Sequence, residues 1–147
     1  MTKYLKGFIS ALLILCLFTV SVSPVSAATE EGIMPRYNNV AMVTGAMSIN
    51  DSGKMSITYK YTGSSSVTTK AVITTYIEKK FLGLFWKRVD IGTTNDQWVD
   101  TINDYRYTGT RTYQLSSSGT YRVTIIYKIY GSGGAADEIE MQKTDSY

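Results

Sequence analysis

Apolar and polar side chains alternate with a period of two along most of the chain after about residue 38. Period two is typical of β-strands, because successive side chains of a strand point to opposite faces of the sheet. No segment after this point has a convincing helical period of 3.6 residues. The pattern therefore predicts one all-β domain over residues 38–147. It is clearest in 120–130, where one face is expected to hold Tyr121, Val123, Ile125, Tyr127 and Ile129.

About seven strands are predicted, separated by turns rich in Gly, Ser, Asn and Asp, which suit the backbone angles of turns. The polar stretch 92–104 carries no predicted strand. Short strands at this spacing indicate an antiparallel β-sandwich of immunoglobulin or fibronectin type III kind. A small closed barrel is the alternative architecture. The predicted strands cover residues 40–50, 55–61, 69–80, 87–91, 105–115, 120–130 and 138–144.

Tyr121 follows the turn residue Gly119 and lies just inside the strand 120–130. A tyrosine in this position resembles the tyrosine corner of β-sandwiches, whose hydroxyl bonds back to the backbone a few residues upstream. The alternative is that Tyr121 is an ordinary aromatic residue of the strand.

Residues 1–27 have the pattern of a cleavable signal peptide. Lys3 and Lys6 precede an apolar run over 8–22, and Val25-Ser26-Ala27 favours cleavage after Ala27, with Ala28 as the alternative. The apolar run has about 15 residues, fewer than the ~20 that a membrane-spanning helix needs. We therefore expect a secreted, extracellular protein that begins with a flexible leader, 28–37.

The only cysteine, Cys16, lies in the expected signal peptide, and the chain has no histidine. The Ser-His-Asp and Cys-His arrangements of nucleophilic enzymes therefore cannot form in the secreted domain. We expect a protein that is not an enzyme and has no cofactor. A glycan hydrolase that uses a pair of carboxylates is a remote alternative. Its candidate residues are Asp90, Asp96, Asp100 and Asp104, or Asp137, Glu138 and Glu140.

The charge of the secreted part is nearly balanced. Of the 15 basic residues, Lys3 and Lys6 belong to the signal peptide, so 13 basic residues remain against 12 acidic ones. A net charge near +1 favours neither nucleic acid nor an anionic membrane surface as a partner. We therefore expect no nucleic acid and no membrane as partners after cleavage, and the oligomeric state stays open.

One polar segment is a candidate calcium site. It contains Asn95, Asp96, Asp100 and Asp104, whose side-chain oxygens are the ligands that Ca²⁺ prefers. The EF-hand spacing and its closing Glu are absent. The alternative is a surface loop, since Asn and Asp are common in turns.

Aromatic and large apolar residues outside the regular pattern form a candidate binding surface. The segment 81–86 interrupts the alternation and is predicted to be an apolar hairpin connection. In 120–130, apolar residues occur on both faces. Exposed apolar patches mark partner sites. The alternative is that these residues close one end of the sandwich core. The candidates are Leu84, Phe85, Trp86, Trp98, Ile126 and Tyr130.

Three short motifs are similar to those of a family of small secreted proteins from Gram-positive, clostridial-type bacteria, catalogued as a domain of unknown function. They are Met34-Pro35-Arg36-Tyr37, Asn50-Asp51-Ser52-Gly53-Lys54 and Gly119-Thr120-Tyr121-Arg122-Val123. The resemblance covers the secreted chain and implies export and a β-sandwich. It implies no catalytic residue and no ligand.

The sequence favours a secreted, non-enzymatic β-sandwich that binds a cell-envelope component, such as the cell wall, or another extracellular protein. Export, the missing catalytic residues and the Tyr and Trp content support this expectation. A structural or self-assembling extracellular protein is the alternative, because strands with two apolar faces can pair edge to edge.

Overall fold

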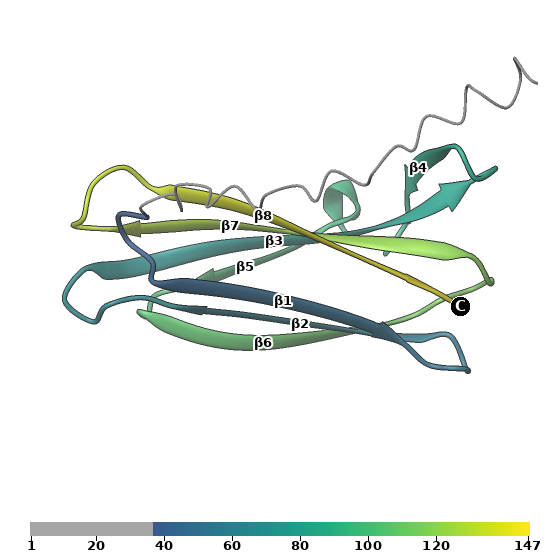
Figure 1. Ribbon diagram of the computed structural model, residues 1–147, viewed down its shortest axis with the longest axis horizontal. Coiled ribbons are helices and arrows are strands. Elements are labelled where there is room, and N and C mark those ends of the chain that lie inside the picture. Colours follow the sequence, from purple (N-terminus) through teal and green to yellow (C-terminus); the bar gives the residue numbers. More distant parts are fainter. Residues whose placement is uncertain (1–36) are drawn as a thin grey trace, which may run out of the picture. The chain divides into compact units, whose positions relative to one another are not determined.

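The alternating pattern is realised as eight strands and one 3-10 turn, Thr94–Asp96, between residues 37 and 147 of a computed structural model (Figure 1). Burial largely alternates along every strand except the short, mostly exposed β4, as expected for strands with one face on a core. The strands are β1 (Met42–Ile49), β2 (Lys54–Thr62), β3 (Thr68–Phe81), β4 (Phe85–Arg88), β5 (Trp98–Ile102), β6 (Arg106–Gln114), β7 (Thr120–Gly131) and β8 (Asp137–Ser146).

The structure describes residues 37–147. The expected signal peptide, 1–27, and all but the last residue of the expected leader, 28–37, lie outside the described residues. Residues 37–147 belong to one compact unit with its own core. Within 37–147 there is no helix of the length and hydropathy required to cross a bilayer.

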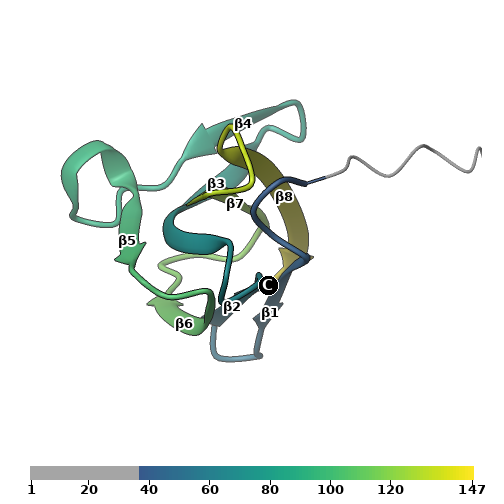
Figure 2. The ribbon, with the colours of Figure 1, turned by 90° about the vertical axis from the view of Figure 1, so that its left-hand side faces the viewer.

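The strands form two antiparallel sheets that pack face to face (Figures 1 and 2). One has the order β1-β2-β6. The other has the order β4-β3-β7-β8, with β5 also paired to β3. In the immunoglobulin fold, strands A, B and E share one sheet with strand D, and strands C, F and G form the other. Here β1, β2 and β6 correspond to A, B and E, and β3, β7 and β8 correspond to C, F and G. The predicted antiparallel β-sandwich of immunoglobulin or fibronectin type III kind is confirmed.

Strand β5 is the main difference from the sequence prediction, which placed no strand in 92–104. It pairs with β3 from Ala71↔Ile102 to Thr75↔Trp98. Its inward positions are Trp98, Asp100 and Ile102. Because Asp100 is charged, it interrupts the apolar face and obscures the period-two pattern in the sequence. Asp100 is accommodated because it forms an ion pair with Arg111 of β6 and accepts a hydrogen bond from the Tyr59 hydroxyl, 2.5 Å away.

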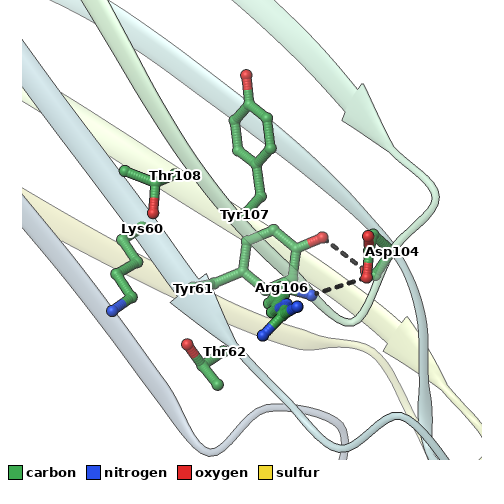
Figure 3. Close-up of a pocket in the computed structure, with 7 residues that line it drawn as sticks. All are labelled: Lys60, Tyr61, Thr62, Asp104, Arg106, Tyr107 and Thr108. Atoms are coloured by element: carbon green, nitrogen blue, oxygen red, sulfur yellow. Dashed lines mark hydrogen bonds between the residues drawn. The ribbon is translucent and has the colours of Figure 1, made fainter.

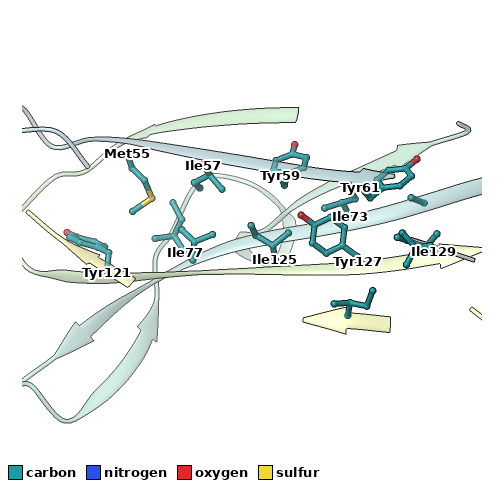
Figure 4. Close-up of a cluster of buried hydrophobic side chains, with 14 of the residues drawn as sticks. Met55, Ile57, Tyr59, Tyr61, Ile73, Ile77, Tyr121, Ile125, Tyr127 and Ile129 are labelled. Atoms are coloured by element: carbon teal, nitrogen blue, oxygen red, sulfur yellow. The ribbon is translucent and has the colours of Figure 1, made fainter. Parts of the chain in front are cut away.

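The core between the sheets combines branched aliphatic side chains with tyrosines (Figure 4). Each fully buried tyrosine ring finds a partner for its hydroxyl. Tyr127 donates to Thr44 O of the opposite sheet at 2.7 Å, and Tyr61 donates to Asp104 O at 2.7 Å. A buried tyrosine needs such a partner, because an unpaired buried hydroxyl costs free energy. The residues that Figure 4 labels are Met55, Ile57, Tyr59, Tyr61, Ile73, Ile77, Tyr121, Ile125, Tyr127 and Ile129.

Tyr121 forms the expected tyrosine corner. Its ring is buried, and its hydroxyl donates to Ser117 O at 2.5 Å, four residues upstream. The bond fixes the turn between β6 and β7 against the core. Of the two interpretations of Tyr121 that the sequence left open, the tyrosine corner is the one that the structure confirms.

A buried carboxylate closes the other end of the sandwich. Asp137, at the start of β8, is 6% exposed and accepts three consecutive backbone N–H groups: Asn38 at 2.8 Å, Asn39 at 2.7 Å and Val40 at 3.0 Å. Hydrogen bonds to an ionised acceptor are roughly twice as strong as neutral ones. Asp137 thus holds the segment before β1 against the other sheet, and serves as a structural residue.

We expect Asp137→Asn to destabilise the sandwich. An amide has one accepting oxygen where the carboxylate has two, so a buried backbone N–H loses its partner. Urea unfolding of residues 28–147 should show a loss of about 2–3 kcal/mol in the free energy of unfolding. Glu140→Gln, an exposed change on the same strand, is the control and should cost under about 0.5 kcal/mol. Equal effects of the two substitutions would contradict the structural role.

The buried tyrosines predict a loss of stability at high pH. Burial raises the pKa of both Tyr61 and Tyr127 to about 12, from 10.0. Between pH 10 and pH 12, Tyr61 and Tyr127 lose their hydroxyl protons in the unfolded chain but keep them in the folded chain. Stability is therefore full below about pH 10 and falls as pH rises toward about 12, by roughly 1.4 kcal/mol per pH unit for each tyrosine. Urea unfolding from pH 8 upward measures this dependence, which Tyr127→Phe should make shallower. A flat profile to pH 11 would contradict it.

Candidate functional site

The connection between β3 and β4 exposes a continuous apolar segment, here called the hairpin tip: residues 81–85 (Figure 1). The exposed fractions are 80% for Leu84, 75% for Leu82, 51% for Phe85 and 48% for Phe81. The predicted apolar hairpin is confirmed. The interpretation that this segment closes one end of the core is wrong, because β3 and β4 carry these residues past the buried cluster.

The turn at the hairpin tip holds a leucine in an unfavourable backbone conformation. Leu82 and Gly83 have φ angles of 49° and 70°, and the Leu84 N–H donates to Phe81 O at 3.0 Å. Two central residues with positive φ are typical of the type I′ turn, where Asn and Gly are preferred. A left-handed conformation costs a residue such as leucine roughly 1–2 kcal/mol. Leu82 is thus both strained and exposed, so folding alone does not explain its presence.

Basic residues lie directly behind the hairpin tip on both faces of the hairpin. They are here called the basic cluster: Lys79, Lys80, Lys87 and Arg88. Lys79 pairs in register with Lys87 on one face, while Lys80 and Arg88 lie on the other. Sequence analysis missed this cluster, although the pairs Lys79-Lys80 and Lys87-Arg88 flank the apolar segment on either side.

Trp86 lies between cations one residue behind the tip. The Lys80 ammonium is 5.8 Å and the Arg122 guanidinium 4.5 Å from its ring centroid. Arg122 also forms an ion pair with Glu78 at 2.7 Å. Because Glu78 is occupied by Arg122, it does not neutralise the basic cluster.

Of the six residues predicted to form a binding surface, three come together. Leu84, Phe85 and Trp86 belong to the hairpin. Trp98 packs against the core, edge-on to Tyr113 with ring centroids 6.3 Å apart.

Ile126 and Tyr130 are half-buried on the outer face of the five-stranded sheet. The Lys70 ammonium lies 5.5 Å from the Tyr130 ring centroid. These two residues belong to the body of β7 and not to the hairpin.

The four candidate calcium ligands have separate roles. Asp100 is bound to Arg111 and Tyr59, and the Asp104 carboxylate accepts the N–H of Tyr105 at 2.6 Å. Asn95 and Asp96 lie in the 3-10 turn with positive φ angles. Residues 37–147 contain no group of three or more His, Cys, Asp or Glu side chains placed to hold a metal ion.

A shallow concavity of about 560 Å³ lies where β2 and β6 meet the loop before β6 (Figure 3). Two of its polar groups are engaged within the fold: the Tyr61 hydroxyl donates to Asp104 O, and the Asp104 carboxylate accepts the N–H of Tyr105. Burial raises the pKa of Tyr61 to about 12, so this residue is neutral at physiological pH. The remaining polar groups can form hydrogen bonds with a ligand. The lining residues are Lys60, Tyr61, Thr62, Asp104, Arg106, Tyr107 and Thr108.

The outer face of the three-stranded sheet is polar, in contrast to the hairpin tip. The side chains on this outer face alternate along each strand with inward-facing ones. Many carry hydroxyl groups, and several of these lie opposite one another on neighbouring strands. Such a face is readily hydrated, so the hairpin tip is the stronger candidate for a binding site. The hydroxyl residues are Thr44, Ser48, Ser56, Thr58, Thr62, Thr108, Thr110 and Thr112.

Comparison with known proteins adds no functional assignment. No protein-family model matches the chain, and a search of the curated proteins finds no match. The resemblance to the clostridial-type family therefore stays a prediction. The geometry of the hairpin is the main observation that bears on function.

Proposed function

We propose that this chain is exported and acts as a non-enzymatic binding protein for a component of the cell envelope or for another extracellular protein. The hairpin tip is the observation that supports this proposal. It presents four large apolar side chains, each about half exposed or more, on one turn. Soluble proteins bury such clusters unless the cluster has a partner.

Two observations weigh against the self-assembly alternative. This alternative was inferred from the two apolar faces of 120–130. The hydrogen-bonding edges of this strand, β7, are both occupied, by β3 and by β8. The outer strand β8 carries charged residues, which disfavour pairing between sheet edges. They are Glu138, Glu140, Lys143 and Asp145.

Three of the carboxylates considered for a carboxylate-based hydrolase are engaged within the fold. Asp100 and Asp104 are engaged as described above, and Asp137 accepts three backbone N–H groups. A general acid or nucleophile must reach a substrate, so the shielded carboxylates of Asp100 and Asp137 do not support the hydrolase.

Export predicts a defined processing product. When the full chain is expressed in a Gram-positive host, we expect it in the culture medium without residues 1–27, since Val25-Ser26-Ala27 is the expected cleavage site. Amino-terminal sequencing should begin at Ala28. A chain that stays in the cell with its first residues intact would contradict export.

The binding function predicts saturable association that depends on the hairpin tip. Residues 28–147 are titrated separately against washed cell walls, isolated membranes and culture proteins. Leu84→Asp should weaken binding to the responding fraction at least about tenfold, because it places a charge in the centre of the apolar contact.

Val99→Asp is the matched control. Val99 is 52% exposed on β5, away from the hairpin, and its substitution should leave affinity within about twofold. No saturable binding to any fraction at high micromolar concentration would overturn the proposed function.

A further inference from the structure

We propose that the hairpin tip and the basic cluster dock this protein on an anionic lipid bilayer. This inference rests on the proposed binding function and names its partner. It departs from the expectation of no membrane partner, which was based on net charge alone. Net charge hides the local arrangement: residues 78–88 contain four basic residues and one acidic residue.

The order of side chains along the hairpin matches the layers of a bilayer surface. Leu82 and Leu84 lie at the end, and the Phe81 and Phe85 rings, 5.2 Å apart, lie next. Trp86 follows one residue behind, about 3 Å along the strand. Tryptophan is enriched at the level of lipid headgroups. The chain thus passes from an apolar end to an interfacial aromatic residue.

The basic cluster lies at the depth of the headgroups when the tip is inserted. The registered pair Lys79 and Lys87 is two residues behind Phe81 and Phe85, or about 7 Å along the strands. Interfacial segments bury their apolar side chains roughly 5–10 Å into the headgroup and acyl boundary. Because cations occur on both faces of the hairpin, an anionic surface can be contacted on both sides of the inserted tip.

The acidic residue nearest the cluster does not oppose this contact. Glu78 accepts two hydrogen bonds from Arg122, from Nε at 2.8 Å and from Nη2 at 2.7 Å. Lys79 is held toward the core side, where its ammonium donates to Ser117 Oγ at 2.7 Å. Three exposed cations therefore lie around the hairpin: Lys80, Lys87 and Arg88, whose guanidinium stacks 3.4 Å from the Tyr76 ring centroid. Glu78 lies in register with Arg88, but its carboxylate is held by Arg122.

A bilayer fits the tip better than a protein does. Residues 81–85 contain no side chain that forms hydrogen bonds. Protein interfaces contain about one hydrogen bond per 100–200 Å² and a polar rim. Side chains in the acyl region of a bilayer do not need hydrogen-bond partners. The first cations of the hairpin follow immediately behind its apolar residues. The tip is also a projecting turn, which can enter a lipid layer.

Vesicle sedimentation tests the proposal directly. Residues 28–147 are used, so that the apolar run 8–22 cannot itself bind lipid. We expect binding to phosphatidylglycerol vesicles at least about tenfold tighter than to phosphatidylcholine vesicles, and weaker binding as salt is raised.

Matched variants separate the tip from the rest of the surface. Leu84→Asp should weaken binding to phosphatidylglycerol vesicles at least about tenfold, and Lys80→Glu with Lys87→Glu by a similar factor. Val99→Asp and the pair Lys54→Glu with Lys60→Glu, on the three-stranded sheet, should stay within about twofold. Circular dichroism confirms that each variant is folded.

Trp86 provides a second readout. The chain has two tryptophans, so Trp98→Phe leaves Trp86 as the single one. On addition of phosphatidylglycerol vesicles its emission should move to shorter wavelength, because the ring leaves water for the lipid interface. An unchanged spectrum at saturating lipid would overturn insertion of the tip.

Two further outcomes overturn the membrane inference; the first keeps the proposed function, and the second replaces it with self-assembly. If vesicles do not bind, but walls or an extracellular protein bind and lose affinity with Leu84→Asp, the hairpin has another partner. If light scattering shows a dimer that Leu84→Asp dissociates, and vesicles again do not bind, the partner is a second copy of the chain.

Discussion

The hydrogen-bonded pairing of β3 with β7 is the interaction on which the rest of the structure depends. It runs from Thr68↔Gly131 to Lys79↔Tyr121 through the centre of the five-stranded sheet. The single cysteine of the chain, Cys16, cannot form a disulfide within this domain, so strand pairing and the core between the sheets must hold it together. The β7 pairing ends at Lys79, two residues before the hairpin tip. The tip is therefore an extension of the most firmly held strand.

The acidic residues and the cations of the hairpin have different roles in this structure. Three buried or half-buried acids are engaged within the fold: Asp137 by backbone N–H groups, Asp100 by Arg111 and Glu78 by Arg122. This leaves the cations around the hairpin without acidic partners. The apolar end is unfavourable to expose to water, and the cations behind it are attracted to an anionic lipid surface, so both features favour contact with such a surface.

The sequence was sufficient to predict the sandwich, the tyrosine corner and the existence of an apolar hairpin, because these depend on alternation and turn residues. It did not reveal β5, since Asp100 interrupts the inward face and finds its partner, Arg111, only in three dimensions. It also grouped Trp98 with the hairpin, although strand pairing turns Trp98 toward the core. The basic cluster was visible as two short pairs of basic residues, but only the strand register shows that they surround the tip.

If the hairpin tip keeps its apolar residues for binding at the expense of stability, changing Leu82 should affect binding and stability in opposite directions. Leu82→Asn tests it most directly, because asparagine suits the left-handed conformation at this position and removes an exposed apolar side chain. We expect urea unfolding of the Leu82→Asn variant to give a free energy of unfolding that equals that of the unchanged chain or exceeds it by about 1 kcal/mol. Binding of the same variant to phosphatidylglycerol vesicles should fall. A clear loss of stability, or full retention of vesicle binding, would contradict this expectation.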